Sequence, residues 1–179
     1  MKVVCISGKA QHGKDTTAGY LKEFLEASGK KVLITHYGDL VKYVCKTFFG
    51  WDGQKNEAGR TILQRVGTDV IRAQQPDYWV SFVAGILKLF PDEWDFVLIP
   101  DCRFPNEVEY MEDCDYDVTH IRIQRDDPFW TSPLTEEQQA HISETALDYH
   151  PHDWLVPNDG DLIALKNKIE ILAKHLAED

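Results

Sequence analysis

The stretch that decides the fold is GKAQHGKDTT, residues 8–17. A short apolar run typical of a buried parallel strand comes directly before it, and apolar residues at helical spacing follow it over 18–25. A strand, a glycine-rich loop and a helix in this order indicate a phosphate-binding loop. Gly8 and Gly13 let backbone N–H groups turn toward an anion, and the helix N-terminus adds the positive end of its dipole. We expect Lys14 to bridge the β- and γ-phosphates of a nucleotide.

Asp15 stands where a phosphate loop usually carries a serine or threonine whose hydroxyl binds Mg²⁺. A carboxylate at this place repels a nucleotide phosphate unless a metal ion or a water molecule lies between them. We therefore expect Asp15 to lie close to Mg²⁺ through water, and Thr16, with Thr17 behind it, to donate to a phosphate oxygen. The alternative is that Asp15 only caps the helix.

A second strong signal is the segment 95–101, in which four apolar residues lead to Asp101. Such a run is typical of a central parallel strand, and open α/β sheets bind ligands at the carboxyl ends of their strands. We expect Asp101 to order the magnesium shell, unless it only caps a helix. Arg103 follows at the same strand end, and its planar fork suits a pair of phosphate oxygens. Glu107 could accept a sugar hydroxyl or pair with Arg103.

The composition favours one domain over residues 1–179. With 179 residues, 43% of them hydrophobic, the chain can bury one full core and has little room for a second. It opens without a long apolar segment, so we expect no signal peptide, no membrane span and a location in the cytoplasm, that of the host if the chain is viral. Its cysteines lack any CxxC spacing, which is typical of a reducing compartment and excludes a zinc framework.

The net charge of −11 argues against a nucleic acid as partner, because neutralisation of phosphates supplies most of the non-specific affinity for DNA and RNA. Anionic small molecules remain possible ligands wherever basic residues converge locally. The acidic stretches are expected to be solvated faces.

Between residues 38 and 90 the pattern predicts helices. The first begins at Gly38 with an apolar face that includes Phe48, and Lys42 lies on another face, either to reach a ligand or to stay at the surface. Gly67 interrupts a later helix, either for the close approach of a substrate or as a kink between two helices. The last helix of the region has a broad apolar stripe that we expect in the core. That stripe consists of Trp79, Phe82, Val83, Ile86, Leu87 and Phe90.

The segment 125–145 is predicted to be a lid, because polar and proline-marked residues follow Arg125 at the end of a strand over 118–123. The sequence TEEQ at 135–138 is an N-terminal helix signature. We expect that helix to continue through His141 and Glu144, which would then share one helical face. The pattern assigns neither residue a role.

Taken together, the loop GKAQHGKDTT, the segment RTILQRVGTDVIRAQQPDYWV at 60–80, the strand end IPDCRFPNEVE at 99–109 and the late HISETALD resemble the phage-type deoxynucleoside monophosphate kinases. The resemblance implies the three-layer α/β fold of P-loop NTPases, similar to nucleoside monophosphate kinases. It has a mostly parallel five-stranded central sheet flanked by helices and a lid. The strands are expected near 3–6, 32–35, 95–100, 118–123 and 154–156.

The resemblance also implies transfer of the γ-phosphoryl group of ATP to a deoxynucleoside 5′-monophosphate with Mg²⁺. An acceptor-binding region falls at about 38–90. The family's phosphate-loop positions fall on Lys9, Gly13, Lys14, Asp15, Thr16 and Thr17. Its monophosphate-binding positions fall on Val41, Lys42, Arg60, Gly67, Thr68, Trp79, Asp101, Arg103 and Glu107. Asp15 and Asp101 would face the metal.

In this interpretation Lys14 and Mg²⁺ hold the donor, Arg103 and Arg60 hold the acceptor phosphate in line, and Arg125 of the lid covers the transferring group. Trp79 either stacks on the base or packs in the core. Longer relatives carry an insertion beside the acceptor site, where this chain is short. The family's base preference and homodimer formation therefore do not carry over, although a homodimer remains possible.

Two other interpretations remain open from the sequence. Phosphomevalonate kinases of the animal type also use a GKD loop, and dephospho-coenzyme A kinases share the architecture. From a different class, a nucleotide-binding switch would hydrolyse ATP slowly and act through a partner. The arginines after the 95–101 strand favour a second anionic substrate over such a switch.

Overall fold

The computed structural model describes residues 1–125, 127 and 130–178. Five strands form one sheet in the order β2-β3-β1-β4-β5, and every pairing is parallel. The strands are β1 (Lys2–Ser7), β2 (Val32–Ile34), β3 (Phe96–Cys102), β4 (Asp117–Gln124) and β5 (Trp154–Pro157). The predicted five-stranded parallel sheet is confirmed.

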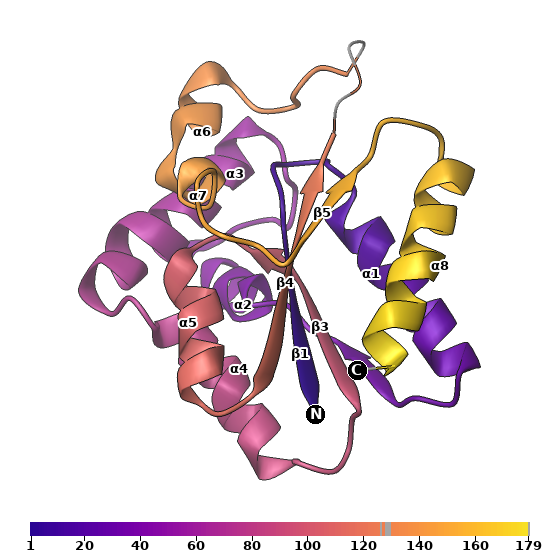
Figure 1. The fold of residues 1–179 in the computed structure, drawn as a ribbon. Helices are drawn as coiled ribbons and strands as arrows, with labels where there is room; N and C mark the ends of the chain where they lie inside the picture. The colour runs from indigo at the N-terminus through magenta and orange to yellow at the C-terminus, as the bar shows by residue number, and fades with distance from the viewer. Residues whose placement is uncertain (126, 128–129, 179) are drawn as a thin grey trace.

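Helices connect the strands and cover both faces of the sheet, which gives three layers (Figure 1). They are α1 (Lys14–Ala27), α2 (Gly38–Phe49), α3 (Glu57–Gln64), the π-helix η1 (Arg65–Arg72), α4 (Tyr78–Leu89), α5 (Pro105–Asp113), α6 (Glu136–Ala140), α7 (Ile142–Thr145) and α8 (Leu162–Glu178). Helices α1 and α8 lie on one face, and α4 and α5 lie on the other. No helix among the residues that the structure describes is both long and apolar enough to cross a bilayer.

The alternation of side chains along β1 explains why one hydrophobic core lies on each face of the sheet. Val4 and Ile6 pack with α1 and α8, whereas Val3 and Cys5 pack with α4 and α5, since successive side chains of a strand point to opposite faces. All of these side chains are fully buried. Burial on both faces is the reason why β1 and β3 are continuous apolar runs, as in other parallel sheets.

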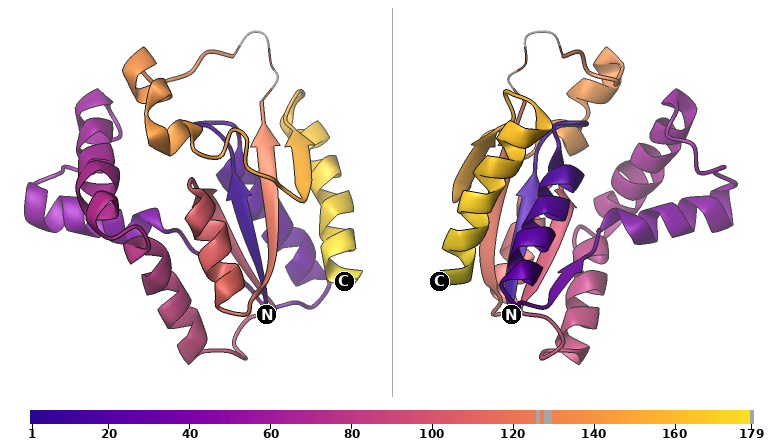
Figure 2. Two further views of the ribbon diagram at one scale, coloured as in Figure 1. Left: turned by 60° about the vertical axis from the view of Figure 1, so that its left-hand side comes forward. Right: turned by 90° about the vertical axis from the view of Figure 1, so that its right-hand side faces the viewer.

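The strand order places two chain segments side by side at the carboxyl ends of the strands. β1 lies between β3 and β4, so the loop that leaves β1 after Ser7 starts beside Cys102 of β3. Helices α6 and α7 lie at the same end of the sheet, to which the strand arrows point, and α2 and α3 stand away from it (Figure 2). The carboxyl ends of parallel strands are where α/β proteins bind their ligands.

The predicted core stripe of α4 is only partly correct. Trp79, Val83 and Leu87 are buried against the sheet, but three other members of the stripe are not. Phe82 is 50% exposed, Ile86 41% and Phe90 47%. Helix α4 packs on one layer only, so its buried face is narrower than its apolar face. Phe48, on the apolar face of α2, is likewise 70% exposed.

The helix predicted to run through His141 is broken there. The TEEQ signature does begin α6, since Thr135 Oγ1 accepts from the Gln138 N–H group at 3.2 Å. His141, however, is extended, with φ −61° and ψ 143°, and its ring accepts from the Ser143 N–H group to cap α7. His141 and Glu144 therefore do not share one helical face.

The packing of the sheet predicts that two leucines on its strands contribute differently to the free energy of unfolding. Leu98 of β3 is fully buried and Leu155 of β5 is 50% exposed. We expect Leu98→Ala to lower the free energy of unfolding by about 2–5 kcal/mol, because it leaves a cavity in the core. The matched Leu155→Ala change should cost about 0.5 kcal/mol or less. Urea denaturation of both variants measures the difference, and equal losses would contradict this packing.

Candidate functional site

The loop between β1 and α1 requires its two glycines. Gly8 has φ +146° and Gly13 has φ +101°, a region that residues with a Cβ rarely adopt. A Cβ at Gly8 would lie 2.4 Å from the Ile123 carbonyl oxygen, and one at Gly13 would lie 2.8 Å from Asn158 Nδ2. The loop thus packs tightly against the strand end of β4 and the segment after β5.

Lys14 is a buried cation within this loop. Its side chain is curled over the loop, where Nζ donates to the Gly8 carbonyl oxygen at 2.7 Å and to the Lys9 carbonyl oxygen at 2.8 Å. Burial lowers the pKa of Lys14 to about 8, and the nearby positive charge of Arg103 acts in the same direction. An anion beside Nζ would offset both effects, so the site favours a negatively charged ligand.

Asp101 joins the end of β3 to the start of α2. Its carboxylate accepts from the Tyr37 N–H group at 3.0 Å and from the Gly38 N–H group at 2.8 Å. The capping alternative for Asp101 therefore has support, although the helix that it caps is α2. The same carboxylate lies in the wall of the cavity described below.

Glu107 does not pair with the side chain of Arg103. It is 2% exposed and accepts from the Arg103 N–H group at 2.6 Å and from the Phe104 N–H group at 3.1 Å. Its ion-pair partner is Arg72 of η1. Burial raises the pKa of Glu107, and the Arg72 guanidinium opposes that rise. Of the two roles predicted as alternatives for Glu107, pairing with Arg103 is wrong, because Arg72 reaches the carboxylate from another helix.

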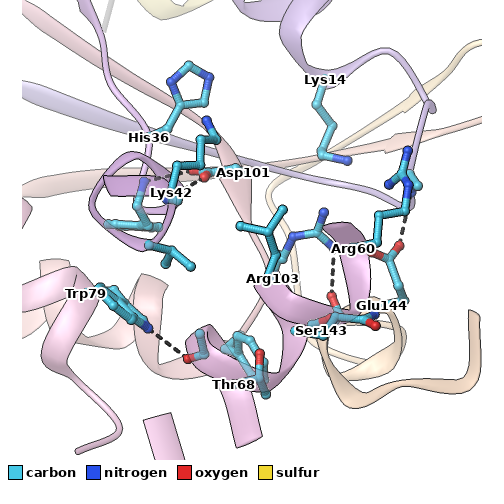
Figure 3. A pocket seen from close by; sticks show the side chains of 18 of the residues that line it. Lys14, His36, Lys42, Arg60, Thr68, Trp79, Asp101, Arg103, Ser143 and Glu144 are labelled. Atoms are coloured by element: carbon cyan, nitrogen blue, oxygen red, sulfur yellow. Dashed lines mark hydrogen bonds and ion pairs between the residues drawn. The ribbon is translucent and has the colours of Figure 1, made fainter. Parts of the chain in front are cut away.

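Arg103 instead lies between β3 and α7. Its Nη1 donates to the Ser143 carbonyl oxygen at 3.0 Å and pairs with the Glu144 carboxylate. Figure 3 shows the Lys14 and Arg103 side chains around the same space, with a dashed line joining Arg103 to Ser143.

One cavity of about 440 Å³ joins these elements. The phosphate loop, the end of β3 and the helices α2, α3 and η1 all contribute to its wall. Eleven of the predicted site residues line it, namely Lys14, Asp15, Val41, Lys42, Arg60, Gly67, Thr68, Trp79, Asp101, Arg103 and Glu107. The structure thus brings together residues that lie up to 93 positions apart in the sequence.

Other predicted residues do not line this cavity. Lys9 forms an ion pair with Asp148 at 3.1 Å. Thr17 is fully buried, and its hydroxyl has no hydrogen-bond partner in the part of the chain that the structure describes. Arg125 forms an ion pair with Asp127 at 3.3 Å and donates its backbone N–H group to His12. Gly13 and Thr16 are also absent from the cavity wall.

Trp79 and Asp15 differ sharply in exposure. The Trp79 ring is 2% exposed, and its Nε1 donates to the Gly67 carbonyl oxygen at 2.9 Å, which supports the packing alternative over stacking on a base. The Asp15 side chain is 83% exposed and forms a hydrogen bond of 3.2 Å with His36 Nε2. That hydrogen bond lowers the pKa of Asp15 and raises the pKa of His36.

The donor set suits a magnesium ion held partly by a ligand. Among the described residues, no group of three or more His, Cys, Asp or Glu side chains is placed to hold a metal by itself. Mg²⁺ usually takes one or two carboxylates, several waters and the phosphates of a substrate. The exposed Asp15 carboxylate in the cavity wall, with Asp101 across from the loop, fits that requirement.

Comparison of the sequence with known families establishes the family to which the chain belongs. The sequence model of one family, described as deoxynucleotide monophosphate kinase, matches residues 29–169. The chain belongs to the deoxynucleotide monophosphate kinase family. The resemblance predicted from the motifs is confirmed.

Two curated members of the deoxynucleotide monophosphate kinase family come from phages. The enzyme of Enterobacteria phage T4 is 28% identical over 119 residues, which cover 65% of this chain and 46% of the T4 protein. The enzyme of Escherichia phage RB69 is 28% identical over 113 residues, 62% of this chain and 43% of that protein. The chain therefore spans about half the length of the curated relatives that it matches.

Solved structures of several kinases share the fold of this family member. An APS kinase of Mycobacterium tuberculosis, solved with AMPPNP and APS, gives a TM-score of 0.54 at 12% identity and covers 97% of both chains. A shikimate kinase of Aquifex aeolicus gives 0.51 at 13% identity and covers 99% of this chain and 98% of its own. At these identities the likeness establishes the fold alone.

The sequence patterns assigned no role to three residues that line the cavity. Arg72 and His36 each pair with a predicted site residue, and Glu144 pairs with Arg103. Arg72 occurs within the VGTDVIRAQQ stretch, and its position on the same helix as Gly67 was a usable signal. The other two contacts join segments far apart in the sequence, and no local pattern marks them.

The buried pair of Arg72 and Glu107 predicts a pH-dependent loss of stability. Arg72→Leu leaves the Glu107 charge buried without its counterion, which should lower the unfolding free energy by about 3–5 kcal/mol at pH 7.5. The folded-state pKa of Glu107 already lies above the ordinary value of 4.5 and should rise further. Because the unfolded chain then releases this proton more readily, the deficit should shrink as the pH falls toward 4.5.

Urea denaturation at both pH values measures this loss. As a control, Lys166→Leu removes an exposed pair with Glu23 and should leave stability nearly unchanged at both. A deficit of Arg72→Leu that is small, or that grows on acidification, would contradict the assignment.

Proposed function

We propose that this protein transfers the γ-phosphoryl group of ATP to a deoxynucleoside 5′-monophosphate in a Mg²⁺-dependent reaction. The observation that carries the proposal is the meeting of Lys14 and Arg103 at one cavity (Figure 3). A switch that only binds and hydrolyses ATP needs the first cation and not the second. Membership of the deoxynucleotide monophosphate kinase family supports the choice of acceptor.

The donor side consists of the phosphate loop and the first turn of α1. Its backbone N–H groups and the helix N-terminus hold the ATP phosphates, and Lys14 turns from the Gly8 and Lys9 carbonyl oxygens toward them. Thr16 donates to a phosphate oxygen, with Lys9, Gly13 and Thr17 shaping the loop. Asp15 and Asp101 would hold Mg²⁺. When bound, Mg²⁺ neutralises charge on the bridging phosphate oxygens.

The acceptor side is the helical region of about 38–90 together with the end of β3. Arg103 and Arg60 hold the acceptor phosphate, because guanidinium groups bind paired phosphate oxygens. Val41, Lys42, Gly67 and Thr68 line the remainder of the pocket with Glu107 and Trp79. Trp79 shapes this wall from within the core, and Glu107 holds the backbone of Arg103.

Catalysis in this account is positioning and charge neutralisation. The transition state of phosphoryl transfer is loose, so little is required of a protein base. Lys14 stabilises charge on the donor phosphates while Arg103 aligns the acceptor oxygen. The lid, about 125–145, of which residues 126, 128 and 129 lie outside the described part of the chain, would cover the cavity and exclude water as a competing acceptor. Arg125 would then have to leave Asp127 to cover the transferring group.

The direct test is a screen of ADP release with the common deoxy and ribo monophosphates as acceptors, together with phosphomevalonate and dephospho-coenzyme A. We expect ADP release to depend on a deoxynucleoside monophosphate and on Mg²⁺. Release that depends on one of the other acceptors would move the protein to that kinase class. Slow release that no acceptor stimulates would favour the ATPase switch.

Two substitutions separate the donor and acceptor sides. We expect Lys14→Ala and Arg103→Ala each to lower kcat/KM by about 10²-fold or more, because the first removes a cation from the donor phosphates and the second removes one from the acceptor phosphate. Only Lys14→Ala should also weaken ATP binding, measured by calorimetry. Arg65→Ala is a matched control, since Arg65 is exposed and does not line the cavity. Weakened ATP binding in Arg103→Ala with normal acceptor binding would reverse the two assignments.

A further inference from the structure

The Glu144 carboxylate connects the phosphate loop to Arg103. One oxygen accepts from the Ala10 N–H group at 3.0 Å, and the other pairs with Arg103 Nη1. The Glu144 side chain is only 5% exposed. A carboxylate this deeply buried is costly unless both oxygens have partners, so these contacts fix its position.

Contacts of helix α7 hold Glu144 in this place. His141 caps the helix through the Ser143 N–H group and forms a 3.1 Å hydrogen bond with Asp69 of η1. The Ser143 carbonyl oxygen accepts from the same Arg103 nitrogen at 3.0 Å. The lid segment is thereby tied to the phosphate loop, to the end of β3 and to the helix that lines the acceptor side.

These contacts also orient the arginine. A guanidinium group carries five N–H donors in one plane, and the two bonds to α7 both leave from Nη1. The donors on Nε and Nη2 lie in the same plane, and a phosphate can approach them while Nη1 stays fixed. The side chain is therefore held at one edge and offers the rest of its plane to an anion.

We propose that Glu144 is a positioning residue of the phosphoryl transfer, which sets the distance between the donor loop and the acceptor arginine. The proposal rests on the function proposed above. Glu144 touches neither substrate in this account and acts through Ala10 and Arg103. Misplacement of a reacting group by about 1 Å can cost 10²-fold in rate, so loss of this bridge should appear in kcat.

The opposite account is that the carboxylate merely occupies the place of a phosphate. Ala10 N–H and Arg103 are both anion-binding groups, and Glu144 would then compete with the incoming substrate. Removal of its charge would in that case tighten nucleotide binding. Positioning predicts no such gain, so the two accounts differ in the sign of one measurement.

The test compares Glu144→Gln, Glu144→Asp and the control Glu137→Gln, which changes an exposed glutamate of α6. Kinetics of ADP release give kcat and the KM of each substrate, and calorimetry gives the Kd of ATP. We expect Glu144→Gln to lower kcat by about 10²-fold with the Kd of ATP within about threefold of the wild type. Glu144→Asp, which keeps the charge, should recover part of kcat. The control should match the wild type.

Tighter ATP binding by Glu144→Gln, or an unchanged kcat, would overturn the proposal. Should Glu144→Gln fail to fold, as judged by its thermal unfolding, the assignment rests on Glu144→Asp, whose kcat must then fall while the Kd of ATP holds. A wild type that binds ATP and phosphorylates no deoxynucleotide contradicts the proposed function. An active wild type with a fully active Glu144→Gln contradicts only the role of Glu144.

Discussion

The buried positive charge of Lys14 is the constraint on which the rest of the site depends. Its ammonium group has two carbonyl oxygens of its own loop as hydrogen-bond partners, and the fold lowers its pKa to about 8. The parallel pairing of β1 with β3 places a second cation, Arg103, near enough to act on that pKa. Two cations at one strand edge repel each other, and anionic ligands relieve the repulsion.

Carboxylate groups fix the positions of the residues at the carboxyl end of β3. Glu107 accepts from the backbone N–H group of Arg103 and forms an ion pair with Arg72 of the π-helix. Asp101 accepts from a backbone N–H group at the start of α2. Glu144 of α7 forms an ion pair with Arg103. Asp101, Glu107 and Glu144 join the end of β3 to α2, α5 and α7, and Glu107 also joins α5 to η1. The cavity is therefore bounded by separate helical elements that these contacts hold together.

The sequence predicts those parts of the fold and of the site that depend on the pattern of neighbouring residues. The apolar run before Gly8, the helical spacing after Lys14 and the strand ending at Asp101 each lie within about ten neighbouring residues, and the structure has all three. The pairing of Glu144 with Ala10 spans 134 positions, and no local rule marks it. His141 sits within a good helical pattern, yet its side chain caps a new helix, which only the fold reveals.

The proposed reaction requires one cleft that holds both substrates with their phosphates between Lys14 and Arg103. A crystal structure with a bisubstrate analogue, an adenosine and a deoxythymidine joined through five phosphates, tests this most directly. We expect one molecule of the analogue in the cavity, with Lys14 and Arg103 on the same phosphate chain and the two nucleosides at opposite ends. An analogue bound through its adenosine half alone, with the chain leading away from Arg103, would contradict the account.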